Sequence, residues 1–242
     1  MEEKKKGLNT NSNLYTIIYA AIIVVIVAFL LAFVSQALKE KQDANVALDQ
    51  KKQILNALNL RGLGDEEAMA KYKEVVVADQ IIDANGNVVK PGSAGGENDG
   101  FRLNSADFKN GQLAVFLCNV DGKTKYVIPV YGMGLWGAIR GFLAVDEDKN
   151  TIYGAYFNHD SETAGLGAEI KDNASWQAKF QGKKIFAEGN ADEVALAVKK
   201  KNDITDPSTQ VDGITGATLT CDGVSNMFKT CLKEYRAFLK NK

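Results

Sequence analysis

The sequence contains little cysteine, histidine or proline: its 242 residues include three cysteines, one histidine and three prolines. The cysteines, Cys118, Cys221 and Cys231, are too few and too scattered to form a disulfide framework. No two of them have the spacing of metal ligands, and His159 cannot complete a Cys/His site alone. No acid–base pair or nucleophile–base pair stands out. We therefore predict neither catalytic residues nor a metal site, and we expect His159 to be a structural or surface residue.

Net charge is also small, because 29 basic and 30 acidic side chains leave a formal charge of −1. This balance excludes nucleic-acid binding driven by overall charge. Charge is absent altogether from residues 8–38, and within them 14–34 is apolar apart from the hydroxyls of one threonine and two tyrosines. A helix of this length spans roughly 31 Å at ~1.5 Å per residue, the thickness of the hydrocarbon core of a bilayer.

Residues 14–34 therefore predict a single transmembrane helix that contacts membrane lipid. The alternative is a cleaved secretory signal, since three lysines precede the segment and Ser35-Gln36-Ala37 loosely resembles a cleavage site. Signal cores run about 7–15 residues, so the length favours a retained anchor. Lysines flank both ends, and the positive-inside rule does not decide the orientation. A long C-terminal domain can be translocated regardless, which favours a cytoplasmic N-terminus over 1–13 and an extracytoplasmic domain.

The segment 35–64 predicts a helical linker between the anchor and the folded domain. Neither glycine nor proline occurs in residues 8–61, so one helix could continue out of the membrane. Two helices with a polar break at 39–45 fit the sequence equally well. Gly62 and Gly64 supply a signal that would end the helix.

The rest of the chain, 65–242, predicts one α+β domain with a mainly antiparallel sheet and flanking helices. Residues 91–100 are rich in glycine and predict a surface loop. Apolar residues recur at three- and four-residue steps after Thr220, which predicts a final helix with one buried face. The other expected elements are strands over 72–77, 113–120, 125–132, 141–146 and 151–160, a hairpin around 85–87, and helices over 175–180 and 192–201.

The segment before that final helix, VDGITGATLT at 211–220, is suited to phosphate binding. Gly213 and Gly216 permit tight turns, and the hydroxyls of Thr215, Thr218 and Thr220 converge on the start of a helix. Unpaired N–H groups and the positive end of the helix dipole favour a phosphate there. The spacing alone also fits a structural role, in which Thr218 or Thr220 is the helix N-cap.

Three motifs together resemble one family. Thr215-Gly216-Ala217-Thr218 resembles the S/T-G-A-T flavinylation motif of FMN-binding domains, in which the last threonine carries FMN through a phosphoester bond. YGMGLWG at 131–137 and HDSETAGLGAE at 159–169 resemble segments of the NqrC family, the C subunit of the Na⁺-translocating NADH:quinone reductase. Ala164 stands where that family usually has proline, and Cys221 where serine is common. Neither departure removes the acceptor hydroxyl.

The resemblance implies that Thr218 carries one covalent FMN per chain, attached by a separate flavin transferase. Asp212 then either assists recognition by the transferase or forms an Asp-Gly turn. Trp136 and Leu166 are expected beside the flavin, although each could equally be an ordinary core residue. The full set of expected flavin-contacting residues is Thr218, Thr215, Gly216, Ala217, Trp136, Glu162, Thr163, Leu166 and Gly167.

The same resemblance implies an electron-transfer role in a membrane complex of six subunits in the bacterial inner membrane, with the domain in the periplasm. The protein would relay electrons towards ubiquinone or menaquinone beside B, D, E and F-type subunits, while partner subunits pump Na⁺. The uncharged span of this chain could not form an ion path. Two alternatives remain, namely the flavin subunit of an Rnf-type ferredoxin:NAD complex and a membrane-tethered scaffold without flavin.

Overall fold

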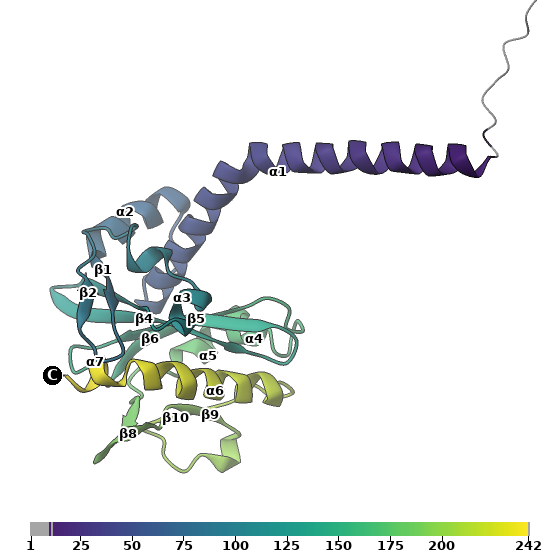
Figure 1. The fold of residues 1–242 in the computed structure, drawn as a ribbon. Coiled ribbons are helices and arrows are strands. Elements are labelled where there is room, and N and C mark those ends of the chain that lie inside the picture. Colours follow the sequence, from purple (N-terminus) through teal and green to yellow (C-terminus); the bar gives the residue numbers. More distant parts are fainter. Residues whose placement is uncertain (1–9, 11, 242) are drawn as a thin grey trace, which may run out of the picture. The chain divides into compact units, whose positions relative to one another are not determined.

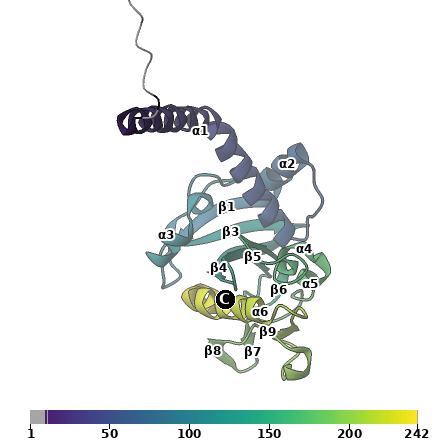
Figure 2. The same ribbon diagram turned by 90° about the vertical axis from the view of Figure 1, so that its right-hand side faces the viewer.

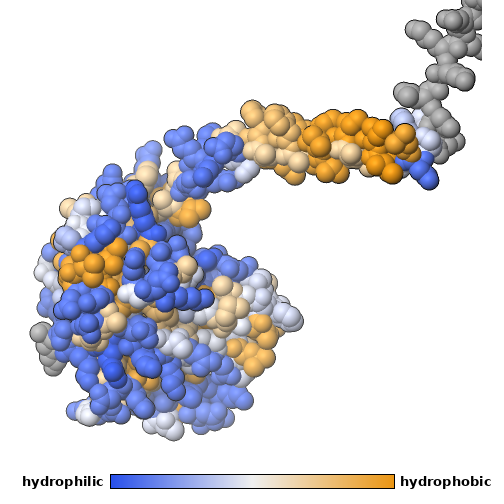
Figure 3. All heavy atoms as spheres, viewed as in Figure 1, coloured by the Kyte–Doolittle hydropathy of each residue, from blue (hydrophilic) through white to orange (hydrophobic). Residues whose placement is uncertain are grey.

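The computed structural model describes residue 10 and residues 12–241, and the chain divides into two compact units, Met1–Ala47 and Leu48–Lys242. Helix α1 (Asn13–Ala57) begins in the first unit and ends in the second. It is continuous, so the alternative of a break at 39–45 is wrong. Large apolar side chains cover its first half and are exposed (Figure 3). This helix is long and apolar enough to cross a membrane.

Helix α1 ends in a Schellman motif before it reaches the glycines expected to end it. The N–H of Leu60 donates to the carbonyl oxygen of Leu55 at 2.9 Å, and Asn59 has a φ of 62°. Asparagine tolerates this left-handed conformation better than most residues, because its short polar side chain can hydrogen-bond locally. Gly62 and Gly64 therefore lie beyond the end of the helix, and the expectation that they stop it is wrong.

Helix α2 (Asp65–Val75) occupies residues that the sequence predicts as the start of a strand. Tyr72 and Val75 are buried on this helix, so their apolar character marks a helix face, and the expected strand over 72–77 begins only with β1 (Val76–Ile82). The hairpin expected around 85–87 is confirmed, because β1 pairs antiparallel with β2 (Val88–Lys90).

A six-stranded antiparallel sheet forms the centre of the domain, with the strand order β2-β1-β3-β4-β5-β6. The predicted α+β class with a mainly antiparallel sheet is therefore confirmed. Its remaining strands are β3 (Leu113–Val120), β4 (Lys123–Met133), β5 (Ala138–Val145) and β6 (Ile152–His159).

Helix α6 (Thr218–Glu234) packs along one face of the sheet, against β4 (Figure 1). Its residues Val224, Phe228 and Leu232 are fully buried on the side that faces the core, as the apolar periodicity of the helix predicts. Figure 2 shows α2 and the end of α1 on the opposite face. The shorter helices are η1 (Gly100–Arg102), α3 (Ser105–Lys109), α4 (Glu169–Asp172), α5 (Ala174–Ala178) and α7 (Arg236–Lys240).

The helix predicted over 192–201 is wrong, because this segment forms two short strands and a turn. Val194, Leu196 and Val198 recur at every second residue, which is the period of a strand. The backbone N–H of Val198 also donates to the hydroxyl of Ser225 at 2.9 Å, which fixes the strand against α6. The elements of this region are β7 (Phe186–Ala187), β8 (Asn190–Val194), β9 (Ala197–Lys199), η2 (Lys201–Asp203) and β10 (Gln210–Asp212).

The glycine-rich loop at 91–100 wraps around the buried carboxylate of Asp79 on β1. Backbone N–H groups of Ser93, Asn98, Asp99 and Phe101 donate to this carboxylate over 2.8–3.3 Å. Asp79 is completely buried, and these four donors supply the hydrogen bonds that burial would otherwise remove. The loop is therefore fixed to the sheet by its own backbone.

Candidate functional site

Three segments meet at the first turn of α6, and the buried carboxylate of Glu162 joins them. One oxygen of Glu162 accepts the backbone N–H of Trp136, in the turn between β4 and β5, at 2.8 Å. The other accepts the hydroxyl of Thr220 on α6 at 2.5 Å. The motifs predict Glu162 as a flavin contact, and the structure shows that its carboxylate is already engaged by the protein.

The hydrogen bonds to Glu162 keep its carboxyl ionised. Burial alone raises the pKa of the group, but the donors from Thr220 and from the backbone of Trp136 and Gly137 outweigh burial and lower it. An ionised carboxylate only accepts hydrogen bonds, so it holds these donors in place. The N–H of Glu162 donates to Nδ1 of His159 at 3.1 Å, which gives that histidine a structural contact.

The glycines of the two upstream motifs make room for this carboxylate and its neighbours. A Cβ atom at Gly134 would lie 2.5 Å from Oε1 of Glu162, and one at Gly167 would lie 2.4 Å from Oε2. A Cβ atom at Gly137 would lie 2.3 Å from the hydroxyl of Ser161. Separations this short are not tolerated, so a side chain at any of these positions would force the side chain of Glu162 or Ser161 out of its present place.

The three threonines of the TGATLT segment have different surroundings. Thr220 is buried, and its hydroxyl is donated to Glu162. Thr215 and Thr218 are exposed, and Thr218 is the first residue of α6. The N-cap position is held by Ala217, which has no side-chain hydrogen bond to offer, so the alternative of a capping threonine is wrong. The first turn of α6 therefore begins at an exposed hydroxyl and without a side-chain cap.

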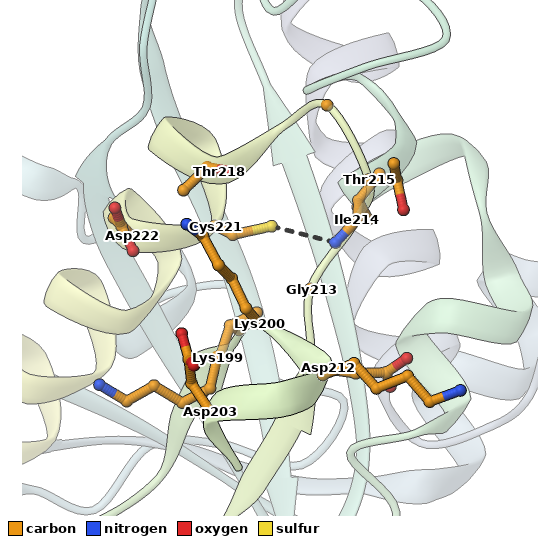
Figure 4. Close-up of a pocket in the computed structure, with 13 residues that line it drawn as sticks. Lys199, Lys200, Asp203, Asp212, Gly213, Ile214, Thr215, Thr218, Cys221 and Asp222 are labelled. Atoms are coloured by element: carbon orange, nitrogen blue, oxygen red, sulfur yellow. Dashed lines mark hydrogen bonds between the residues drawn. The ribbon is translucent and has the colours of Figure 1, made fainter.

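A cavity of about 510 Å³ opens beside Thr218 (Figure 4). Asp212 lies on its wall, where both carboxylate oxygens accept the ammonium of Lys179 at 2.9 Å. Cys221, at the position where serine is common, accepts the N–H of Ile214 at 3.3 Å through its sulfur. The lining consists of Val198, Lys199, Lys200, Lys201, Asp203, Asp212, Gly213, Ile214, Thr215, Gly216, Thr218, Cys221 and Asp222.

Exposed apolar side chains, here called the apolar patch, come from the three segments that meet at α6. They are Met133, Leu135, Trp136, Leu166 and Leu219. Trp136 is 66% exposed and Leu166 is 42% exposed, so the alternative that they are core residues is wrong. Large apolar groups held at the surface by a rigid framework are suited to contact a flat apolar ligand.

The lysines at 199–201 and Asp222 are site residues that the sequence does not predict. The lysines fall in a segment expected to be helical, and only the end of β9 and the turn of η2 bring them to Thr218. Charged residues in a run ordinarily indicate a solvated surface, so no signal in the sequence distinguishes these three.

Comparison with known proteins identifies the class of domain. Residues 134–233 match the FMN-binding domain family, and this range contains Glu162 and Thr218 and begins at the turn that holds Trp136. The fold and the site thus define an FMN-binding domain.

Similarity over the whole chain identifies the family. The chain is 34% identical to the C subunit of the Na⁺-translocating NADH-quinone reductase of Haemophilus ducreyi, over 91% of this chain and 90% of that protein. It is 30% identical to the corresponding protein of Pseudomonas aeruginosa, over 96% of this chain and 97% of that protein. The crystal structure of the C subunit from Parabacteroides distasonis superposes with a TM-score of 0.76 at 38% identity, covering 85% of this chain and 98% of that one. The chain belongs to this family, the C subunits of the Na⁺-translocating NADH-quinone reductase. That reductase is an oxidoreductase complex of several subunits. The chain is membrane-anchored.

Proposed function

We propose that the domain carries one FMN, covalently attached to Thr218 through a phosphoester bond. The observation that supports this most directly is the contrast between two hydroxyls two residues apart. The hydroxyl of Thr220 is buried and bound to Glu162, whereas Thr218 is exposed at the uncapped start of α6. A phosphate on Thr218 would lie near the positive end of the helix dipole, which stabilises it by about 0.3–1 kcal/mol.

The residues around Thr218 fit such a group. The apolar patch offers contact to the isoalloxazine ring through Trp136 and Leu166. Thr215, Gly216 and Ala217 would contact the phosphate from the loop, where the first two line the cavity. Thr163 accepts the N–H groups of Leu166 and Ala168 through its carbonyl oxygen, which shapes the loop up to Gly167. Bound FMN supplies one-electron and two-electron redox chemistry, while this chain holds it and leaves one side accessible. Accessibility is what an electron carrier between protein partners requires.

We further propose that the protein relays electrons within the complex towards ubiquinone or menaquinone. Its neighbours would be B, D, E and F-type subunits. A separate flavin transferase would attach the FMN, because none of the residues that the structure describes hydrogen-bonds the hydroxyl of Thr218 as an activating base would. The domain would lie on the periplasmic side of the bacterial inner membrane.

Ion transport would belong to the partner subunits. Helix α1 has no charged residue in its apolar segment, so Na⁺ would cross the membrane through other chains of the complex. Similarity over nearly the whole chain supports this role over that of an Rnf-type flavin subunit or a scaffold without flavin.

Intact-mass measurement of the protein co-expressed with a flavin transferase tests the attachment. We expect one FMN adduct in the wild type and none in Thr218→Ala. Thr215→Ala is the matched control, since Thr215 is an exposed hydroxyl in the same loop and its variant should keep the adduct. An adduct that persists in Thr218→Ala would overturn the assignment of the acceptor.

A further inference from the structure

The cavity beside Thr218 has one wall that the proposed function does not explain. Its volume of about 510 Å³ lies within the range of small-ligand sites. Strand β9 and the turn of η2 form this wall, and they place the consecutive lysines Lys199, Lys200 and Lys201 on the same cavity as Thr218. In Figure 4 the side chain of Lys200 extends towards the first turn of α6.

The ammonium groups of these three lysines are not engaged within the part of the chain that the structure describes. In residues 10 and 12–241, no ion pair or side-chain hydrogen bond involves any of them. Of the carboxylates that line the cavity, Asp212 is taken by Lys179 from outside the lining. The negative charges of Asp203 and Asp222 are then outnumbered by the positive charges of the three lysines. The cavity therefore carries an excess of positive charge next to the acceptor hydroxyl, which favours an anionic ligand.

Thr218 lies at the boundary between two chemically different surfaces. It lines the cavity together with the three lysines, and the next residue, Leu219, belongs to the apolar patch. FMN has a similar division, since an anionic phosphate stands at one end and a flat aromatic ring with apolar faces at the other. The match in polarity specifies a direction for the ligand, with its phosphate over the cavity and its ring towards the patch.

The geometry points to a phosphate subsite: Lys199, Lys200 and Lys201 bind the phosphate of FMN and thereby set the direction in which the flavin lies from Thr218. This inference rests on the proposed function for the identity of the ligand. It adds a set of residues outside the three motifs, and it assigns the cavity to the phosphate rather than to the ring.

Noncovalent binding of FMN and of riboflavin, which lacks only the phosphate, tests the subsite. The full chain, produced without a flavin transferase and held in detergent, is titrated with each ligand at low salt while flavin fluorescence is followed. We expect the wild type to bind FMN about tenfold more tightly than riboflavin, as several exposed charge pairs together allow. In the triple variant K199Q/K200Q/K201Q this preference should disappear, with the affinity for riboflavin unchanged.

Two further variants separate a phosphate subsite from a general effect of charge or folding. The variant K171Q/K229Q/K233Q removes the same charge from exposed lysines outside the cavity and should keep the tenfold preference. Asp222→Asn removes a carboxylate from the cavity and should increase the preference for FMN by about threefold. Inorganic phosphate should compete with FMN and leave riboflavin binding unchanged.

Several outcomes would overturn the subsite. They are an unchanged preference in the triple variant, an equal loss of FMN and riboflavin binding in it, and equal or undetectable binding of both ligands by the wild type. Because the titration involves no covalent bond, its result is independent of the intact-mass experiment. Failure of the subsite and failure of attachment at Thr218 are therefore distinguished.

Discussion

Two glycine-rich loops of this domain each surround a buried carboxylate, and they do so in opposite ways. The loop at 91–100 supplies three of the four backbone donors to Asp79, and the fourth, Phe101, follows it directly. Glu162 takes its donors from two other segments, the turn at Trp136 and the helix residue Thr220. The first arrangement fixes a single loop to strand β1, while the second joins three separate segments and leaves apolar side chains exposed. The origin of the donors, rather than glycine content, distinguishes the structural loop from the candidate site.

The strongest test of this comparison is removal of the structural carboxylate. Asp79→Ala leaves four backbone N–H groups without their acceptor, one of them buried and three partly buried, so we expect a loss of about 3–5 kcal/mol in the free energy of unfolding. Chemical denaturation of the chain in detergent measures it. Gly96→Ala should act in the same direction, because its Cβ atom would lie 2.4 Å from the side chain of Asp79. A loss below about 1 kcal/mol in both variants would show that the loop does not depend on this carboxylate.

Replacing the bridging carboxylate should have a smaller and more local effect. Glu162→Gln keeps the shape of the side chain but leaves one acceptor oxygen in place of two, so we expect a loss of about 1–2 kcal/mol. Amide hydrogen exchange should speed up at Trp136 and in the first turn of α6, and remain unchanged in the loop at 91–100. Equal acceleration in both regions would contradict the separation of the two loops.

The effect of Glu162 should also depend on pH. Its folded-state pKa is lowered, so its contribution to stability is present above the unfolded value of about 4.3 and is lost as the pH falls through the lower folded-state pKa. The difference in unfolding free energy between the wild type and Glu162→Gln should therefore be constant from about pH 7 to about pH 5 and shrink below about pH 4. A difference that grows on acidification would reverse the assigned sign.

The smallest effect on stability is expected at the apolar patch. Trp136 is 66% exposed, so Trp136→Ala in the protein without flavin should change the free energy of unfolding by less than about 0.5 kcal/mol. In the flavinylated protein the same variant should alter the visible circular dichroism of the flavin, because the ring loses a neighbouring surface. Val89→Ala, on the exposed edge strand β2, is the control and should change neither quantity. A loss of about 2 kcal/mol in the free energy of unfolding of Trp136→Ala would show instead that Trp136 contributes to the core.

The sequence predicts an element of the fold correctly where the apolar residues of a long segment follow one regular spacing. Helix α6 has a clear three- and four-residue spacing, and strands β3 to β6 stand between turn residues, so these elements are confirmed. The segment 192–201 is misassigned because its apolar residues are few and because the contacts that fix it as a strand, to β10 and to Ser225, lie outside the segment. Tertiary contact decides such a segment, and local propensity does not.

The motifs predict which residues form the candidate site, but they do not predict which of those residues bind one another. Glu162 and Thr220 are both visible in the sequence, yet only folding reveals that they bind each other across 58 positions. That contact explains why one threonine of the motif is buried and another is presented. The lysines at 199–201 carry no motif at all, since their significance comes from the cavity that residues 198–203 and 212–222 enclose.

The three cysteines have a practical consequence for locating this domain in the cell. All are buried, and burial raises the pKa of each thiol, so the folded protein presents little thiolate to an alkylating reagent. We therefore expect the native cysteines to react little with a thiol-labelling reagent. A single cysteine introduced at an exposed position such as Ala94 would be the one reactive target, and a membrane-impermeant maleimide would then report on which side of the membrane the domain stands.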